Sequence, residues 1–298
     1  MLRLAPIALV VALLAATAAA FAVTEGLKLT PSPIRSTRVD KVFSPTCRCA
    51  TAAAHVQFRL RKADRLTLVL VDSRNRVVRT LVDARSVDRG VHRFAWNGRD
   101  DAGARVPDGV YRPRVHLARQ HRTILLPNPI RVDTRPPTAA ITIRRRLLTP
   151  GLNRVSTVYR LSEPAHPQLL ADGRVVVRGR FERTRGKLDW YGAGFPAGVV
   201  RLSLRAVDLA GNVGEATPAV PVRIVYLELA RHRLRVKARG ALAVGFGPLR
   251  SARWRLAGRT GVARGGHVRI KAPARPGAYT LFLFVDGHGD RARVVVAP

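Results

Sequence analysis

The two cysteines are the first candidates for chemistry in this chain. Cys47 and Cys49 are its only cysteines, and a single residue separates them. A pair this close could close a disulfide in a tight turn, exchange disulfides, or supply half of a metal site. We expect a structural disulfide that clips a local turn, because no second Cys or His pair lies nearby to complete a metal site. Free or intermolecular thiols and redox or metal chemistry stay open as alternatives.

The remaining residue types give little support to catalysis. The eight histidines are scattered, and His116 and His121 lie five positions apart, which suits neither one face of a strand nor one turn of a helix. The chain contains no Gly-x-Ser-x-Gly elbow, P-loop or dinucleotide fingerprint. A carboxylate pair that meets only in the folded chain stays open. We therefore expect a protein that is not an enzyme, with no catalytic residues, no metal and no cofactor.

One acidic turn region could in principle hold Ca²⁺, which takes several oxygen ligands. It contains Asn97, Asp100, Asp101 and Asp108. Asn, Asp and Gly are also the ordinary residues of turns, where their side chains bond to nearby backbone and positive φ is tolerated. We therefore expect turns rather than a calcium site, and we expect the neighbouring Trp96 to be a core residue.

The N-terminal segment indicates the compartment. From Leu4 to Val23 the chain holds no charge and one polar residue, and a helix of this length would match the hydrocarbon core of a membrane. Ala18, Ala19 and Ala20 also provide a small-residue cleavage site of the kind found in signal peptides. We expect an exported protein in which residues 1–23 form a membrane anchor or, alternatively, a cleaved signal peptide, with the bulk outside the cytoplasm.

The elements that follow are predicted to be strands. Residues 24–44 contain Pro31, Pro33 and no sustained period, so we expect residues 24–54 to form a stalk that carries the two cysteines. From His55 the apolar residues alternate, with Val56, Phe58 and Leu60 facing one side. Turn residues then separate further apolar runs, which is typical of hairpins. The first folded domain is predicted to span residues 55–135.

Within this domain a strand that ends in Trp is followed by a polar Gly turn and a Pro-x-Gly turn. The stretch resembles the FlgD-type Ig-like domain, whose signature is Trp-(Asp/Asn)-Gly-x-(Asp/Asn)-x-x-Gly followed by Val-Pro-x-Gly-x-Tyr. The matching residues are Trp96, Asn97, Gly98, Asp100, Gly103, Val106, Pro107, Gly109 and Tyr111. The resemblance implies a β-sandwich accessory module of an exported bacterial protein, with no catalytic residues to carry over.

The Pro-x-Gly turn recurs twice more. Gly109, Gly198 and Gly277 are 89 and 79 positions apart, close to the size of an immunoglobulin-like domain. We therefore expect an all-β chain of tandem Ig-like sandwiches after one apolar helix, with a second domain at 136–225 and a third at 226–298. Further motif residues of these repeats are Trp190, Asp208, Gly211, Asn212 and Tyr279.

Charge is the other outstanding property of the chain. Its 53 Lys and Arg stand against 19 Asp and Glu, a formal net charge of +34. Such a surface attracts polyanions, and the guanidinium fork suits phosphate and carboxylate. A general bias of composition toward arginine explains the same excess, which is spread over all three repeats. Nucleic acid is not the expected partner, because single-strand binding usually needs exposed aromatic platforms and aromatic residues are only 6%.

These observations predict a non-catalytic scaffold or adhesive protein of the cell envelope. The expected partners are the cell membrane, through the N-terminal helix, and anionic envelope polymers or envelope proteins. Two alternatives stay open. One is an exported module whose function is to bind a wall phosphate polymer, an acidic glycan or anionic lipid. The other is an accessory subunit of an envelope complex that offers a free sheet edge.

Overall fold

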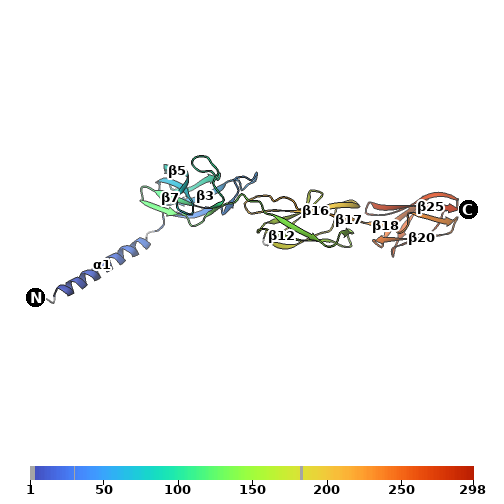
Figure 1. The fold of residues 1–298 in the computed structure, drawn as a ribbon, viewed down its shortest axis with the longest axis horizontal. Helices are drawn as coiled ribbons and strands as arrows, with labels where there is room; N and C mark the ends of the chain where they lie inside the picture. Colours follow the sequence, from blue (N-terminus) through green and yellow to red (C-terminus); the bar gives the residue numbers. More distant parts are fainter. Residues whose placement is uncertain (1–3, 30, 182–183) are drawn as a thin grey trace. The chain divides into compact units, whose positions relative to one another are not determined.

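The computed structural model describes residues 4–29, 31–181 and 184–298. The N-terminal apolar run forms helix α1 (Leu4–Leu29), whose side chains are described from Leu9 to Phe21. In the described part of the chain, no helix combines the length and the apolar character needed to cross a membrane. The expected membrane anchor is therefore not supported. The rest of the chain is β-structure, which confirms the prediction of a mostly β protein with several sheets (Figure 1).

The chain divides into two compact units, one up to Thr134 and one from Arg135 to Pro298. The first unit contains one sandwich with a core of its own. Its smaller sheet has the order β1 (Ile34–Val39), β3 (Ala54–Leu60), β6 (Gly90–Trp96). Its larger sheet has the order β2 (Val42–Phe43), β9 (Ile130–Val132), β7 (Gly109–Leu117), β4 (Asp64–Val71), β5 (Val77–Val87), and β8 (Arg122–Leu125) also pairs with β7.

The alternating sequence accounts for these strands. In β3, Ala54, Val56, Phe58 and Leu60 are buried while the residues between them face outward. Part of the segment that we expected to be a stalk belongs to the sandwich, which corrects that expectation. β1 pairs antiparallel with β3, and β2 pairs in parallel with β9. β1 was missed because it buries only its end residues, Ile34 and Val39, and β2 because it contains only two residues.

The second unit contains two sandwiches of the same plan. In the second sandwich the sheets have the orders β10 (Ala139–Ile143), β12 (Val155–Leu161), β15 (Arg185–Trp190) and β11 (Leu147–Leu148), β17 (Val220–Ile224), β16 (Gly198–Val207), β13 (His166–Ala171), β14 (Arg174–Arg178). In the third they have the orders β18 (Leu227–Leu229), β20 (Ala241–Pro248), β23 (His267–Lys271) and β19 (Arg233–Lys237), β25 (His288–Ala297), β24 (Gly277–Val285), β21 (Ala252–Leu256), β22 (Arg259–Ala263).

Three repetitions of one topology are visible in these orders. In each sandwich the first strand lies in the smaller sheet, and the next strand crosses to the larger sheet and pairs in parallel with the last strand. Gly109, Gly198 and Gly277 are the first residues of β7, β16 and β24, which are equivalent strands. The regular spacing of these glycines thus marks the start of the same strand in every repeat. A continuous cluster of buried apolar side chains extends from the second sandwich into the third.

Candidate functional site

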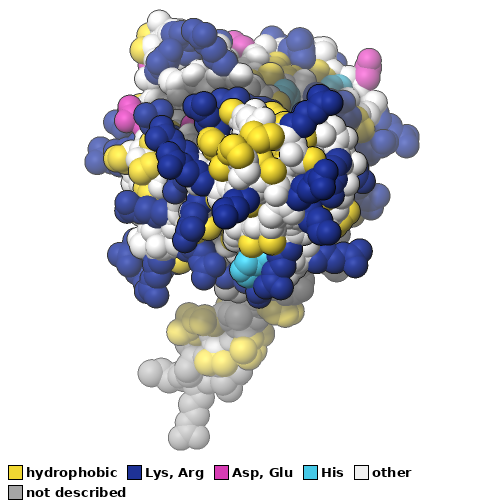
Figure 2. Space-filling view, turned by 90° about the vertical axis from the view of Figure 1, so that its right-hand side faces the viewer, with side chains coloured by type: hydrophobic (Ala, Val, Ile, Leu, Met, Phe, Trp, Pro, Cys, Tyr) yellow, Lys and Arg dark blue, Asp and Glu magenta, His cyan; other side chains and the backbone are white. Residues whose placement is uncertain are grey.

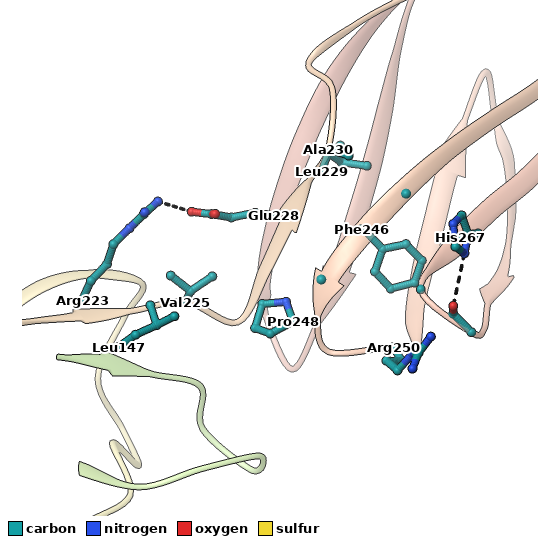
Figure 3. Close-up of a pocket in the computed structure, with 14 residues that line it drawn as sticks. Leu147, Arg223, Val225, Glu228, Leu229, Ala230, Phe246, Pro248, Arg250 and His267 are labelled. Carbon is teal, nitrogen blue, oxygen red and sulfur yellow. Dashed lines mark hydrogen bonds and ion pairs between the residues drawn. The ribbon is translucent and has the colours of Figure 1, made fainter. Parts of the chain in front are cut away.

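A hollow of the second unit lies where its two sandwiches meet. Only Val225 and Tyr226 separate β17 of the second sandwich from β18 of the third. The groove beside them has a volume of about 680 Å³. Its apolar lining includes Leu147, Val225 and Pro248, drawn from both sandwiches (Figure 3).

The polar groups of this groove are few. Among the described residues that line it, the ionisable side chains are Arg223, Glu228, Arg250 and His267. Arg223 and Glu228 point toward each other and form an ion pair across the joint, and the His267 ring bonds to the carbonyl of Gly265 at 3.2 Å (Figure 3). These groups include no nucleophile next to a base. The groove is thus an apolar hollow bordered by one ion pair.

Tyr226 is the residue that ties the joint together. Its side chain is buried, and its hydroxyl donates a hydrogen bond of 2.7 Å to the carbonyl of Phe195 in the second sandwich. Its ring stacks on that of His288 in the third, with centroids 3.8 Å apart and planes 13° from parallel. Burial raises the pKa of the Tyr226 hydroxyl, and the charge of Asp286 adds to the effect. The hydroxyl therefore stays a neutral donor.

A carboxylate fixes the start of the third sandwich in the same region. Asp290 accepts hydrogen bonds from the backbone N–H of Leu229 at 2.8 Å and of Arg291 at 2.7 Å, and it bonds to the His232 ring at 2.9 Å. Burial alone would raise the pKa of Asp290. These hydrogen bonds and the nearby His232 outweigh that effect and hold the pKa below its ordinary value. Asp290 thus ties β18 to β25 as an ionised group.

In the first sandwich, the Trp motif builds a core and a set of turns. Trp96 is 1% exposed, and its ring lies 5.3 Å from that of Phe43 and 5.1 Å from that of Tyr111. The indole N–H donates to the carbonyl of Arg99 at 2.9 Å. Tyr111 donates its hydroxyl to the carbonyl of Pro107 at 2.8 Å, four residues upstream. The aromatic residues are therefore structural here.

The polar motif residues of that sandwich accept hydrogen bonds, some within the turns and some from other segments. Asn97 accepts from the N–H of Arg99, and Asp100 accepts from the N–H of Ala104. Asp101 and Asp108 accept from the backbone N–H and hydroxyl groups of Thr80 and Thr134. Gly98 has a φ of +72°, and a Cβ there would lie 2.8 Å from the Pro45 side chain. Gly103, with a φ of +82°, has open space around it. Asn97 and Asp100 thus accept within their own turns, whereas Asp101 and Asp108 accept from residues 21 and 26 positions away.

Residues 44–120 match the model of the FlgD Ig-like domain. The chain contains a FlgD Ig-like domain. The match includes the whole Trp96 to Tyr111 stretch and confirms the resemblance drawn from those residues. Cys47 and Cys49 lie near the start of the FlgD Ig-like domain and are disulfide-bonded, with their Cα atoms 5.3 Å apart.

Beyond the FlgD Ig-like domain, the predicted motif residues of the later repeats are also structural. Trp190 is 4% exposed, and its ring packs edge-on against that of Phe195. Asp208 accepts two hydrogen bonds from Asn212, one from the backbone N–H and one from the side-chain amide, both at 2.8 Å. Gly211 has a φ of +93° in that turn. Tyr279 repeats the Tyr111 bond and donates to the carbonyl of Arg275 at 2.9 Å.

Among solved structures, three titin domains I67–I69 in an E-to-A mutated variant are 10% identical to this chain, cover 90% of it and 99% of their own chain, and give a TM-score of 0.32. A tetra-tandem repeat in the extending region of a large adhesion protein is 12% identical, with coverage of 88% and 74% and a TM-score of 0.32. A 1.5-MDa bacterial ice-binding adhesin is 12% identical, with coverage of 90% and 97% and a TM-score of 0.28. No curated protein matches the chain.

Sequence reasoning missed the residues of the joint. Tyr226, Arg223 and Glu228 belong to no motif, and their roles arise only when two sandwiches meet. One signal was present in the sequence: Tyr226 lies in an uninterrupted apolar run, Ile224 to Leu227, at the predicted boundary between domains. A boundary without Gly, Pro or polar linker residues indicates a fixed joint rather than a flexible one.

Proposed function

We propose that this chain is a non-catalytic scaffold, exposed at the surface of a bacterial cell or secreted from it, that holds Ig-like domains in a fixed series. The observation that carries the proposal is the joint between the second and third sandwiches. Two residues connect them. One of these is the buried Tyr226, which is hydrogen-bonded to the second sandwich and stacked on a ring of the third, and the apolar core continues through the joint.

The contacts of Tyr226 give the joint its expected stiffness. A stacked aromatic pair contributes about 0.5–1.5 kcal/mol beyond its buried area, and a hydrogen bond contributes about 1 kcal/mol net. Independent rotation of the two sandwiches would break both contacts and the Arg223–Glu228 ion pair together. A spacer needs this property, since a chain of freely jointed domains would not keep its ends apart.

The proposed location rests on the disulfide and on the apolar N-terminal run. Disulfides persist in oxidising compartments, and Cys47 and Cys49 are bonded. Fractionation of the producing cells and the mass of the mature protein test this. A mature chain beginning near Ala20 and released from the cells would show secretion, and an intact chain retained by membranes would show an anchor. Recovery in the cytosol with reduced cysteines would contradict export.

The scaffold role is tested by the distance between the two sandwiches in the full chain. Spin labels at exposed Val158 and Val295, introduced through non-canonical amino acids so that the disulfide is kept, report that distance by pulsed EPR. We expect one narrow distribution, which Tyr226→Ala broadens. Tyr191→Ala is the matched control, because Tyr191 is 56% exposed on the second sandwich. A broad distribution in the unmodified chain would contradict a fixed scaffold.

A further inference from the structure

A second hollow opens at the other end of β23 from the joint, on the third sandwich. Its volume is about 510 Å³, and both aromatic and cationic side chains line it. The aromatic residues are Trp254 on β21 and Tyr279 on β24, both partly buried. The cations are Arg239, Arg259, Lys271 and Arg275. The part of the chain that the structure describes contributes no acidic residue to its lining.

Trp254 lines this hollow and a neighbouring one, and we call the two together the groove around Trp254. Trp254 pairs across the sheet with Gly261 of the edge strand β22, and a Cβ on Gly261 would lie 2.8 Å from three indole atoms. The absence of a side chain at Gly261 therefore makes room for the ring. Trp254 also lines an adjacent hollow of about 380 Å³, together with Arg264 and Arg269. The indole thus stands between two neighbouring subsites that both carry arginine.

The cations of the groove are not neutralised by the protein. Among the described residues, no carboxylate forms an ion pair with Arg239, Arg259, Lys271 or Arg275. Arg259 donates to the carbonyl of Lys271 at 3.1 Å, and the Tyr279 hydroxyl donates to the carbonyl of Arg275 at 2.9 Å. These bonds hold the backbone that carries two of the cations. Figure 2 shows a face on which Lys and Arg side chains surround hydrophobic ones and acidic side chains are few.

We propose that the groove around Trp254 binds a linear acidic glycan whose sugar units carry carboxylate or phosphate groups. The guanidinium fork matches either anion, and an aromatic surface suits the apolar face of a sugar ring. Two subsites on either side of one indole fit a polymer with charge at regular intervals. The expected setting is the exterior location proposed above, but the binding chemistry does not depend on the scaffold role.

The geometry favours a glycan over a nucleic acid. Single-stranded nucleic acid is held by bases that stack on exposed aromatic faces. Trp254 is partly buried, and part of its ring lies against Gly261, so it offers a limited contact surface beside the cations. Such a surface can meet one sugar ring but provides no row of stacking platforms.

Fluorescence anisotropy with the full chain tests the proposal at physiological salt. The probes are a labelled hexuronate oligosaccharide, a sugar-phosphate oligomer, a neutral oligosaccharide of equal length, polyphosphate and single-stranded DNA. We expect at least one of the two acidic sugar probes to bind, and to bind more tightly than the neutral sugar, polyphosphate and DNA. Which one binds distinguishes carboxylate from phosphate. Tighter binding of polyphosphate or DNA than of either sugar probe would overturn the proposal.

Variants assign the binding to the groove. Arg259→Gln combined with Arg275→Gln removes two charge-assisted contacts, and we expect affinity to fall about tenfold. Arg144→Gln with Arg145→Gln is the matched control, since it removes the same charge from an exposed turn of the second sandwich. Trp254→Phe keeps a ring in place but reduces the contact, so it should also weaken binding. If the Arg259/Arg275 variant and the Arg144/Arg145 variant lose the same affinity, the probe is attracted by net charge alone, and the proposed binding site is contradicted.

Discussion

The tryptophans of the first and third sandwiches show how one architecture builds two different surfaces. Trp96 ends β6 in the smaller sheet, is 1% exposed, and has its N–H bonded to Arg99. Trp254 lies on β21 in the larger sheet and is partly buried, and its N–H has no hydrogen-bond partner among the described residues. The tryptophan of the smaller sheet is therefore a core residue, whereas the tryptophan of the larger sheet forms the wall of a groove.

What the two sandwiches share is the turn before β7 and before β24. Tyr111 and Tyr279 each donate a hydroxyl to the carbonyl four residues upstream, at 2.8 Å and 2.9 Å. The second sandwich has Val200 at the equivalent position, and there the hydroxyl of Tyr226 bonds to the Phe195 carbonyl instead. The carbonyl of Phe195 lies five residues before Val200, one position earlier than the carbonyls used in the other two turns. The second sandwich therefore lacks the bond that Tyr111 and Tyr279 make, and its turn is bonded to the joint residue Tyr226.

The largest expected effect comes from removing each tryptophan. Trp96→Ala should cost about 3–5 kcal/mol, because it leaves a cavity next to Phe43 and Tyr111. Trp254→Ala should cost less than half as much, because solvent already reaches part of the ring. Hydrogen exchange of β3 and of β21, measured separately in the full chain, gives the two local stabilities. Equal losses of stability in the two variants would contradict the assignment of Trp96 to a core and Trp254 to the wall of a groove.

The next effect concerns the two glycines that face these regions. Gly98→Ala should cost about 2–4 kcal/mol, since it combines left-handed backbone with contact against Pro45. Gly261→Ala meets only the edge of a side chain that can move, so we expect about 1 kcal/mol and a displaced indole. Gly103→Ala, with positive φ but open space, separates backbone strain from contact. Hydrogen exchange gives the stabilities, and a Gly98 variant no worse than the Gly103 variant would exclude the contact with Pro45.

A smaller effect is expected from the two hydroxyl groups. Tyr111→Phe should destabilise the first sandwich by about 1 kcal/mol, because its partly buried bond to Pro107 is lost. The bond of Tyr279 is exposed, and water can replace it, so Tyr279→Phe should cost less. Thermal unfolding of each variant against the parent chain measures the difference. A larger loss of stability for Tyr279→Phe than for Tyr111→Phe would contradict the conclusion that the Tyr111 bond is the more buried of the two.

The pH dependence of the two sandwiches should be alike. Asp64 accepts from the N–H groups of Arg65 and Arg119 and from Gln120, as Asp290 does from its three partners. Burial alone would raise the pKa of Asp64, but these bonds lower it, as they do for Asp290. Because the folded pKa is below the unfolded value of 3.8, the stabilisation is complete above that value and is lost as pH falls through the folded pKa.

Acid titration of local stability in the Asn variants tests this dependence. Asp64→Asn should reduce the loss of stability of the first sandwich as the pH falls, and Asp290→Asn should do the same for the third sandwich. Asp83 on β5 is the control position, because its carboxylate has no hydrogen bond in the described structure. An unchanged acid limb in either test variant would show that its carboxylate does not stabilise the fold as an ion.

A feature of this fold could be predicted from the sequence where its contacts join residues that are close along the chain. The Trp96 to Tyr111 stretch was predictable because the hydrogen bonds of its two aromatic residues are local, each joining residues within four positions. The strands β1 and β2 were missed because they depend on partners far along the chain. Trp254 lies far upstream of its glycine turn, so its place in a groove followed only from the pairing with Gly261. Tyr226 needed two folded sandwiches before its role could be seen.

The most direct test is fluorine NMR of the full chain labelled with 5-fluorotryptophan, which places one reporter at Trp96, one at Trp190 and one at Trp254. The resonances are assigned with Phe variants, and the chain is titrated with the acidic sugar probe. We predict that the Trp254 resonance shifts progressively while those of Trp96 and Trp190 stay in place. A titration that leaves Trp254 unmoved, or that moves all three equally, would contradict it.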